Sequence, residues 1–504
     1  MMSRAGEQFD VVVIGGGPGG STAATLIAMQ GHSVVLLEKE ATPIYKVGES
    51  LLPSTIHGIC PMLGVSEEIK RANFVRKQGG SFRWGKRKDI WTFTFSDSSA
   101  MQSPTAYAYQ VERMKFDAIL LANARRKGVD VREQHSVIDL LIENGRVGGV
   151  VCSKANDEWP IRAKYVLDAS GHSSMTAKHA GERVYSQFFR NVSVFGYFQH
   201  GKRLAPPNSG NIFCAAFERG WFWYIPLSAD LTSVGAVIGQ EHAQLLQQGH
   251  ATALKELISA CPPISELLRD AEPATQIPYN DVRVRKDYSY SHTHFWRPGL
   301  ALIGDAACFI DPVFSSGVHL ATYSALVAAR SVNSCLRNLV DEEKAFSEFE
   351  NRYRREYRYF YDFLMAFYDI DQDLETYYWD ARKVTNSEER GNEAFIRLVA
   401  GMAGSGERLF SNASEFMSQR AGISKSLFPE TPGEGIGRAR DERGAKFMTD
   451  FTAELAQMQL QAAMKKVLPY QQPLFEGGLI PSRDGFHWAP ATQSPTAKLV
   501  GGIR

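Results

Sequence analysis

One N-terminal pattern constrains the fold of this chain more than any other feature. Asp10 and the four apolar residues after it predict a buried parallel strand over 10–14, and the glycine motif Gly15-x-Gly17-x-x-Gly20 follows it at once. The next residues predict a helix over 21–30 and a second strand over 34–37, with Glu38 at its end. This order is typical of the first βαβ unit of a dinucleotide-binding domain.

Each residue of this fingerprint has a physical task. Gly15 permits the tight turn, Gly17 lets a pyrophosphate approach the backbone, and Gly20 lets helix and strand pack closely. The helix N-terminus offers N–H groups and a partial positive charge to the phosphates. Glu38 is expected to accept hydrogen bonds from the adenosine ribose, and its charge disfavours the 2′-phosphate of NADP.

Further segments indicate FAD as the cofactor. Residues 301–307 predict a strand followed by Asp305, and similar segments of FAD proteins place the aspartate on the ribityl chain. Arg113 matches an arginine that often contacts FAD phosphates or ribose, although alone it also fits a helix-surface cation. The motif Gly433-x-Gly435-x-Gly437 has no preceding strand and is interpreted as a loop, so we expect no separate NAD(P)H domain.

The composition excludes several classes of protein. The 504 residues, 44% of them hydrophobic, can bury a large core, and a net charge of +1 gives no sign of nucleic-acid binding. Six cysteines without a CxxC pair favour reduced intracellular thiols over disulfides or a zinc site. Residues 11–31 carry no charge, but their glycines and hydroxyl residues argue against a membrane span. We expect a soluble, cytoplasmic protein.

A short aromatic segment, Trp221-Phe222-Trp223-Tyr224-Ile225-Pro226, predicts a strand. Because alternate residues of a strand point to the same face, Trp221 and Trp223 share one face, and Phe222 and Tyr224 share the other. Taken alone, the segment fits an ordinary core strand, since aromatic residues are common there. The chain also contains a dinucleotide fingerprint and a lysine in a glycine-rich segment, and both favour a functional role for this segment. We call the segment the aromatic ledge.

Five segments, in order, resemble those of the flavin-dependent halogenases. They are the glycine motif at 15–20, a loop at 47–50, Lys77, the WxWxIP segment at 221–226 and a turn at 311–318. The likeness covers about residues 8–380. It implies an α/β fold: a three-layer, Rossmann-like FAD-binding domain of the aromatic-hydroxylase type, with an inserted antiparallel sheet and a mostly helical C-terminal part.

The resemblance also implies a reaction and its reagents. Reduced FAD from a separate flavin reductase, with oxygen and chloride or bromide, makes hypohalous acid. The backbone N–H groups of Ser316 and Gly317 hold the halide, because amides in a turn make a concave anion site. Trp221 and Trp223 form a barrier beside the flavin that keeps the aromatic substrate from reaching it.

Two further site elements follow from the resemblance. Lys77 delivers the electrophilic halogen to the substrate, since burial lowers the pKa of an amine and makes it a nucleophile. From the residues alone, Lys77 also fits a solvated charged face, because other basic residues surround it. The loop Gly48-Glu49-Ser50 is expected over the flavin, although Glu49 also fits a surface carboxylate.

Position 314 bears on the substrate. The tryptophan-acting branch of the family carries a glutamate two positions before the hydroxyl residue of the halide turn, and this chain has Phe314 there, before Ser316. An indole needs a base to lose its ring proton, whereas a phenol pushes its own electrons. The resemblance thus favours a phenolic, tyrosyl-like ring over free tryptophan, with pyrroles open. Such rings are often tethered to a carrier protein in antibiotic biosynthesis.

Other functions account for fewer of these features. A flavin-dependent aromatic hydroxylase shares the fold and the cofactor, but it needs an open flavin face where this chain has the aromatic ledge. A reductase of isoprenoid double bonds explains neither Trp223 nor Lys77. A non-enzymatic flavoprotein leaves both the lysine and the halide turn unexplained.

The remaining chain is interpreted as mostly helical. Aromatic and charged residues at helical spacing over 340–400 predict one or two long amphipathic helices. We divide the chain into a core at 1–340 and a C-terminal region at 341–504, with a helix at 449–466, loops at 404–407 and 433–444, and a loop-rich tail. We expect no metal site and no Ser-His-acid set, with loop histidines at 292 and 294 and no partner for His57, His172 or His319.

Overall fold

The computed structural model describes residues 7–41, 45–86, 89–98, 101, 105–286, 289–369, 373–385, 391–402 and 473–490. They belong to two compact units, 1–405 with 481–488 and 406–480 with 489–504. The helix predicted at 449–466 and the loops predicted at 404–407 and 433–444 lie outside the described residues. The domain boundary at residue 340 stays a prediction.

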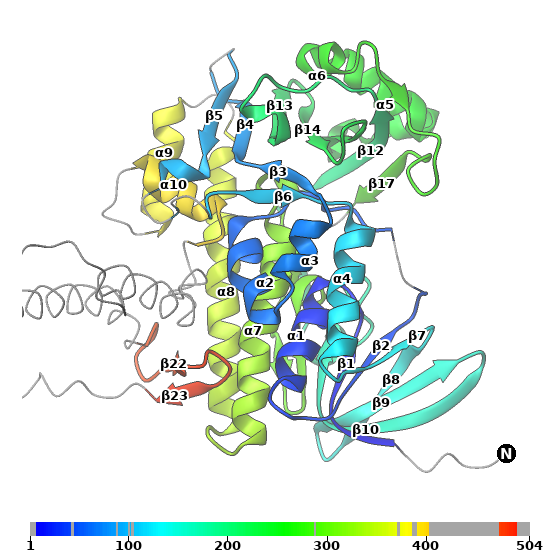
Figure 1. The fold of residues 1–504 in the computed structure, drawn as a ribbon, viewed down its shortest axis with the longest axis vertical. Helices are drawn as coiled ribbons and strands as arrows, with labels where there is room; N and C mark the ends of the chain where they lie inside the picture. The colour runs from blue at the N-terminus through cyan, green and yellow to red at the C-terminus, as the bar shows by residue number, and fades with distance from the viewer. Residues whose placement is uncertain are drawn as a thin grey trace, which may run out of the picture. The chain divides into compact units, whose positions relative to one another are not determined.

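The fingerprint lies at the centre of a mixed eight-stranded sheet (Figure 1). β1 (Glu7–Ile14) runs parallel to β2 (Val34–Glu38) and β10 (Asp157–Asp168) on its two sides. The sheet is completed by β7 (Asp130–Glu133), β8 (Ser136–Glu143), β9 (Arg146–Lys154), β19 (Trp296–Arg297) and β20 (Leu300–Leu302). Side chains 11–13 are fully buried, as expected for a parallel strand that is covered on both faces.

Helices pack beside this sheet, and the two longest run nearly vertically in Figure 1. α1 (Pro18–Ala28) packs against α4 (Arg113–Arg126) and α7 (Ser316–Leu336), and α7 packs against α8 (Glu342–Phe367). The amphipathic region predicted over 340–400 is divided into α8, α9 (Leu374–Thr385) and α10 (Gly391–Val399). Its aromatic stripe is core, because Phe346, Phe349, Phe360, Phe363 and Phe367 are at most 1% exposed.

A second eight-stranded sheet carries the aromatic segment. Its strands are β4 (Gly79–Arg83), β5 (Trp91–Thr94), β12 (Asn191–Gln199), β13 (Ile212–Phe217), β14 (Gly220–Pro226), β15 (Leu231–Gly239), β16 (Glu272–Pro273) and β17 (Arg283–Lys286). All neighbours are antiparallel except β13 and β4. One face packs with α5 (His250–Ser259) and α6 (Pro262–Leu267) in a hydrophobic core that includes Phe222 and Tyr224.

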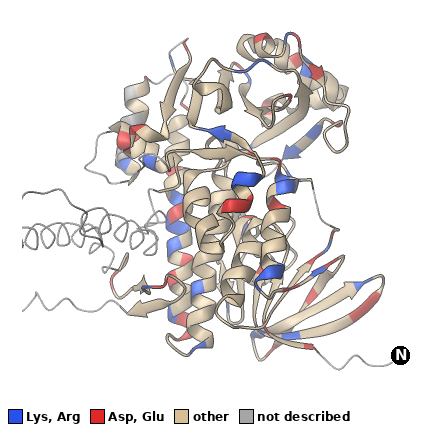
Figure 2. Cartoon of the chain, in the orientation of Figure 1, with Lys and Arg blue, Asp and Glu red and all other residues tan. Residues whose placement is uncertain are grey.

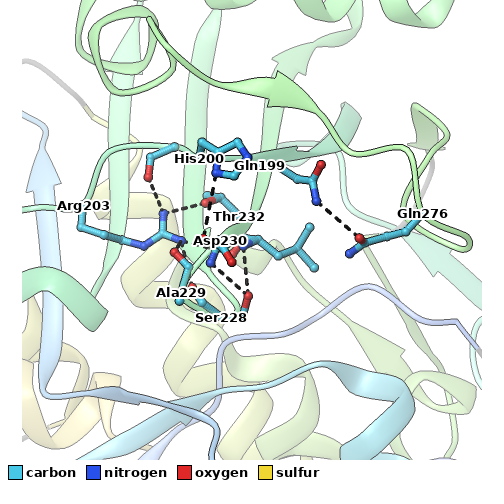
Figure 3. A network of polar contacts seen from close by, with 10 residues as sticks. Gln199, His200, Arg203, Ser228, Ala229, Asp230, Thr232 and Gln276 are labelled. Atoms are coloured by element: carbon cyan, nitrogen blue, oxygen red, sulfur yellow. Dashed lines mark hydrogen bonds and ion pairs between the residues drawn. The ribbon is translucent and has the colours of Figure 1, made fainter.

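A polar network closes one end of this sheet (Figure 3). The guanidinium of Arg203 donates to the hydroxyl of Thr232 at 2.7 Å and to the carbonyls of Ser228 and Ala229 at 2.9 and 3.0 Å. Figure 3 also shows the backbone bond of 3.0 Å from His200 to Asp230. These bonds join the end of β12 to the turn between β14 and β15 and hold the sheet that carries the ledge.

Smaller elements complete the fold. They are β3 (Val75–Lys77) with β6 (Ala108–Gln110), β11 (Arg183–Tyr185) with β18 (Tyr290–His292) and β21 (Cys308–Phe309), and the pair β22 (Leu479–Pro481) and β23 (Trp488–Pro490). A π-helical turn at Ser54–Ile59 leads into α2 (Cys60–Leu63) and α3 (Ser66–Arg71). The predicted fold class, an α/β Rossmann-like domain with an inserted antiparallel sheet and a helical C-terminal region, is confirmed. In the described part of the chain, no helix has the length and apolar character that a membrane crossing requires.

Candidate active site

The three fingerprint glycines meet different surroundings. A Cβ on Gly15 would lie 2.5 Å from the carbonyl oxygen of Ala169, and one on Gly20 would lie 1.9 Å from that of Gly15. A Cβ on Gly17 would meet no atom within 4 Å. Gly15 and Gly20 are therefore required by packing, whereas the space at Gly17, at the N-terminus of α1, is open to a ligand.

Glu38 holds the glycine loop from the end of β2. Its Oε2 accepts a hydrogen bond of 2.7 Å from the N–H of Gly16, and its Oε1 accepts one of 3.0 Å from the N–H of Glu40. A carboxylate oxygen has two lone pairs, so each oxygen keeps capacity for a ribose hydroxyl. The sequence motif contained no sign of this second, structural task.

Arg113 is the first residue of α4 and turns its side chain toward the loop at 47–48. Its Nη1 donates to the carbonyl of Val47 at 2.8 Å, and its Nε and Nη2 pair with the carboxylate of Asp117 at 2.9 Å each. The side chain is 10% exposed, so the interpretation as a helix-surface cation is wrong. Burial alone would lower the pKa of Arg113, but the pairing with Asp117 outweighs it and the pKa is raised.

Asp305 lies within the electrostatic reach of Arg113. Burial raises the pKa of the Asp305 carboxyl to about 6, against the opposing effect of the positive charges of Arg113 and Lys46. A carboxyl group and a guanidinium that are both largely withdrawn from water are typical of a polar ligand site in a cleft. The two segments that predicted FAD contacts are thus electrostatically coupled through these side chains.

Lys77 ends β3 as a buried amine. It is 3% exposed, and its Nζ donates to the hydroxyl of Ser50 at 3.0 Å and to the carbonyl of Leu51 at 3.2 Å. Burial lowers the pKa of Lys77 to about 7. Within the described ranges, no carboxylate forms an ion pair with it. The solvated charged face that its neighbours suggested is therefore wrong for this side chain.

The predicted halide turn is the entry to a long helix. A 3₁₀ turn at Pro312–Phe314 precedes Ser315, which has a left-handed φ of 60°, and α7 then runs for 21 residues from Ser316. The first N–H groups of a helix lack acceptors within the helix and carry the positive end of its dipole. Ser316 and Gly317 supply two of these N–H groups, so the turn has the electrostatics of an anion site.

Lys77 and this turn line one small cavity. The turn contributes Val313, Phe314 and Ser315 to its lining but neither Ser316 nor Gly317, and its volume is about 10 Å³. That volume is roughly what one water molecule occupies. Lys77 and the segment before α7, which lie more than two hundred residues apart in sequence, are thus neighbours in the fold.

The aromatic ledge has the two faces that strand alternation predicts. The rings of Trp221 and Trp223 lie side by side with centroids 6.2 Å apart, and Phe222 and Tyr224 lie in the hydrophobic core on the opposite face. The indole N–H of Trp221 donates to the hydroxyl of Tyr368 at 2.7 Å. That hydroxyl donates to Asp311 at 2.5 Å, which joins the ledge to the segment before the halide turn.

Phe314 lies in an aromatic cluster. Its ring packs against Phe367 and Phe363 with centroids 4.6 and 5.3 Å apart, and the residue is 4% exposed. A glutamate at this position would place a charge among apolar rings, which is costly without a partner. The site therefore offers no base at position 314.

A buried hydrogen-bonded set of a serine, a histidine and a glutamate was not predicted from the sequence. His319 Nδ1 lies 2.8 Å from the hydroxyl of Ser54, and its Nε2 lies 2.8 Å from Oε1 of Glu356. The expectations that His319 lacks a partner and that no Ser-His-acid set exists were wrong. Since all three are at most 1% exposed, the set ties α7 and α8 to the π-helical turn and is closed to a substrate.

Two other histidines also have partners. His292 belongs to strand β18 rather than to a loop, and its Nδ1 lies 2.8 Å from the carbonyl of Ala307. His57 Nε2 lies 2.8 Å from the carbonyl of Tyr107. In the described part of the chain, no group of three metal-ligating residues is present.

Comparisons with known proteins identify the family. The family model described as "Tryptophan halogenase" matches residues 10–103 and 96–429. A tryptophan 2-halogenase of Chondromyces crocatus is 34% identical over 412 residues, which cover 79% of this chain and 76% of that protein. This chain belongs to the flavin-dependent halogenases.

Solved structures support this assignment. The structure of the myxobacterial chondrochloren halogenase CndH, described as an FAD-dependent halogenase, is 49% identical, with a TM-score of 0.73 and coverage of 96% of this chain and 100% of that one. The flavin-dependent brominase Bmp2 is 25% identical, with a TM-score of 0.69 and coverage of 83% and 100%. The halogenase is thus an FAD-dependent enzyme.

Proposed function

We propose that this halogenase transfers halogen to a phenolic ring and that Lys77 is the group that delivers it. The observation that carries the proposal is the cavity shared by Lys77 and the segment 313–315, which leads into α7. At about 10 Å³ the cavity is the size of one water molecule, so the larger hypohalous acid, like an aromatic ring, enters only when the lining side chains move apart. A buried amine with a pKa of about 7 exists partly in the neutral, nucleophilic form near neutral pH.

The residues of the fingerprint fit FAD. The open space at Gly17 and the N–H groups of α1 suit the pyrophosphate, and Glu38 retains lone pairs for the ribose. Arg113 and Asp305 supply charged groups of both signs beside the loop at 47–50. When bound and reduced, FAD supplies the electrons that activate oxygen, and the protein's own task is to position the halide, the lysine and the barrier.

The entry of α7 fits the halide. The N–H groups of Ser316 and Gly317 lie at the positive end of a helix and offer an anion site without a cationic side chain. Trp221 and Trp223, whose indole N–H groups bond to Tyr368 and Ser233, form the wall beside the flavin. This wall favours halogenation over hydroxylation, because hydroxylation requires the ring itself to reach the flavin.

Phe314 supports a phenolic substrate class. A phenol supplies its own electrons during electrophilic attack, so an apolar residue at this position suffices. The name of the Chondromyces crocatus relative states tryptophan as the substrate of that protein. The apolar surroundings of Phe314 favour a phenol for this chain.

A carrier protein fits the surface near Lys77. Lys70, Arg71 and Arg76 are exposed on α3 and β3, and Figure 2 shows Lys and Arg on β3 and on the edge strand β17. Carrier proteins are acidic, and complementary charge steers association. The reduced FAD comes from a separate flavin reductase, by transient contact or by diffusion.

Mass spectrometry of the products tests this proposal. The holoenzyme is supplied with a flavin reductase and bromide and is offered a free tyrosyl-like phenol, the same phenol on a carrier protein, and free tryptophan. We expect brominated phenol, with the carrier-bound form preferred, and little bromotryptophan. Bromination of tryptophan alone would contradict the phenol assignment, and a hydroxylated product formed without halide would contradict halogen transfer.

A further inference from the structure

Three residues form a hydrogen-bonded chain that leads into the loop at 47–51. The hydroxyls of Tyr45 and Tyr197 lie 2.6 Å apart, and the Tyr197 hydroxyl donates to Oε1 of Glu49 at 2.6 Å. Tyr197 and Glu49 are each 2% exposed, whereas Tyr45 is half-buried. The chain therefore begins near solvent and ends at a buried carboxyl group one residue from Ser50, the hydrogen-bond acceptor of Lys77.

Glu49 has the contacts of a carboxyl group that can hold a proton. Its Oε2 accepts a weak bond of 3.2 Å from the N–H of Gly48, and no lysine or arginine pairs with it in the described ranges. The nearby guanidinium of Arg113 is directed to Val47 and Asp117 instead. Burial raises the pKa of Glu49, against the donation from Tyr197 and the charge of Arg113.

The tyrosines can pass a proton only by exchange. Burial raises the pKa of Tyr45 to about 12 and that of Tyr197 well above its ordinary value, so neither accumulates as the anion. Each hydroxyl must take up one proton as it releases another. The remaining ionisable groups around the chain are Tyr279, whose ring lies 4.7 Å from that of Tyr197, and Arg283 and Arg285, whose charges act on Tyr45.

The halogenation reaction has a net demand for a proton. Reduced flavin, oxygen, a halide anion, an aromatic C–H and one proton give oxidised flavin, the aromatic halide and two molecules of water. Two hydrogens come from the reduced flavin, one from the ring and one from solvent, and the charge of the halide is balanced by that proton. A site that excludes bulk water needs a path by which this solvent proton can enter.

We propose that Tyr45, Tyr197 and Glu49 are a proton relay that carries this solvent proton into the active site. Glu49 releases its proton to the reacting oxygen, which becomes water, and its carboxylate then takes the proton of Tyr197. Tyr197 takes that of Tyr45, and Tyr45 takes one from solvent, so every O–H bond broken is formed again. The inference rests on the proposed position of the flavin beside the loop at 47–51.

Four variants test the relay. Tyr45→Phe and Tyr197→Phe remove one hydroxyl each, and Glu49→Gln keeps an acceptor for Tyr197 but cannot exchange a proton. Tyr279→Phe is the matched control, because its ring belongs to the same cluster while its hydroxyl bonds to Glu112 at 3.1 Å, outside the chain. Infrared spectra of the protein without flavin and bromination rates of the holoenzyme are recorded for each.

The relay predicts a protonated carboxyl band that is absent from E49Q, shifted in Y197F and unchanged in Y279F. It also predicts that Y197F slows formation of hypohalous acid roughly 10- to 100-fold at pH 8, with a smaller loss at pH 6, where solvent protons are more abundant. Identical spectra and pH profiles for Y197F and Y279F would overturn the relay. The relay and the Lys77 assignment can fail independently of each other. A Lys77 variant changes halogen transfer to the ring and leaves hypohalous acid formation intact, whereas a relay variant slows hypohalous acid formation.

Discussion

The indole nitrogen of Trp221 donates a 2.7 Å hydrogen bond to the hydroxyl of Tyr368, which lies just beyond the last residue of α8. The same hydroxyl donates to Asp311, whose Oδ1 accepts the N–H of Val313 at 3.1 Å. The ledge, the end of α8 and the segment before the halide turn are thus fixed by one buried polar network. This network therefore positions the ring of Trp221 relative to the N–H groups of Ser316 and Gly317.

The first prediction concerns this network. Tyr368→Phe leaves the N–H of Trp221 and the carboxyl of Asp311 without their shared partner, so the free energy of unfolding falls by about 1–3 kcal/mol. The KM for halide rises as the turn loosens. Tyr361→Phe is the control, since Tyr361 lies on α8 and its hydroxyl bonds to Ser186, outside this network, at 3.1 Å. Equal unfolding curves and equal KM values for the two variants would refute the role of Tyr368.

The second prediction separates ligand space from packing at the fingerprint. Gly17→Ala adds a methyl group into open space, so it leaves the thermal stability of the flavin-free protein unchanged and weakens FAD binding. Gly20→Ala clashes with the backbone at Gly15 and lowers stability without FAD. Calorimetry with and without FAD measures both effects. Unchanged FAD affinity in G17A would mean that the pyrophosphate does not approach this residue.

The third prediction follows from the lowered pKa of Lys77. Between about pH 7 and its ordinary value of 10.5, the unfolded chain holds a proton at this lysine that the folded chain has lost. Stability therefore rises with pH across this window, and the penalty of a buried charge is complete below it. Lys77→Met removes the penalty, so its gain in stability is largest at pH 6 and shrinks toward pH 10.

Urea unfolding at several pH values measures this gain. Lys70→Met, at a residue whose side chain is 58% exposed, controls for the loss of a lysine from the unfolded chain. A difference between K77M and the native protein that does not vary with pH would show that Lys77 titrates normally in the folded state.

The fourth prediction treats Ser54, His319 and Glu356 as a structural set. Ser54→Ala leaves a buried ring nitrogen of His319 without its partner and lowers the free energy of unfolding by about 1–3 kcal/mol. Because the hydroxyl is closed to substrates, the native protein hydrolyses no activated ester. Ester hydrolysis that disappears in S54A would contradict this view and reveal a second active site.

Much of the fold followed from local patterns. The predicted strand over 34–37 ends one residue short of β2, and strand alternation correctly placed Trp221 and Trp223 on one face. The helix predicted over 21–30 begins instead at Pro18, because proline is favoured in the first turn, where its missing N–H costs nothing. The strong periodic signals of the βαβ unit and of α8 made these elements predictable.

The contacts of the site were harder to predict. Ser54 and His319 lie 265 residues apart, and Glu49 and Tyr197 lie 148 apart, so no local spacing joins them. The start of α7 could not be predicted, because Ser315 adopts a left-handed conformation that is rare outside glycine. Burial of Lys77 was equally unpredictable, since exposed basic residues surround it in sequence.

The central claim is that Lys77 passes the halogen to the ring. The most direct measurement compares the native holoenzyme with Lys77→Met for two products at once, hypohalous acid captured by a small scavenger and brominated phenol. The account predicts that K77M forms hypohalous acid at a rate close to that of the native enzyme and loses phenol bromination by at least about 100-fold. Phenol bromination by K77M at the native rate would contradict it.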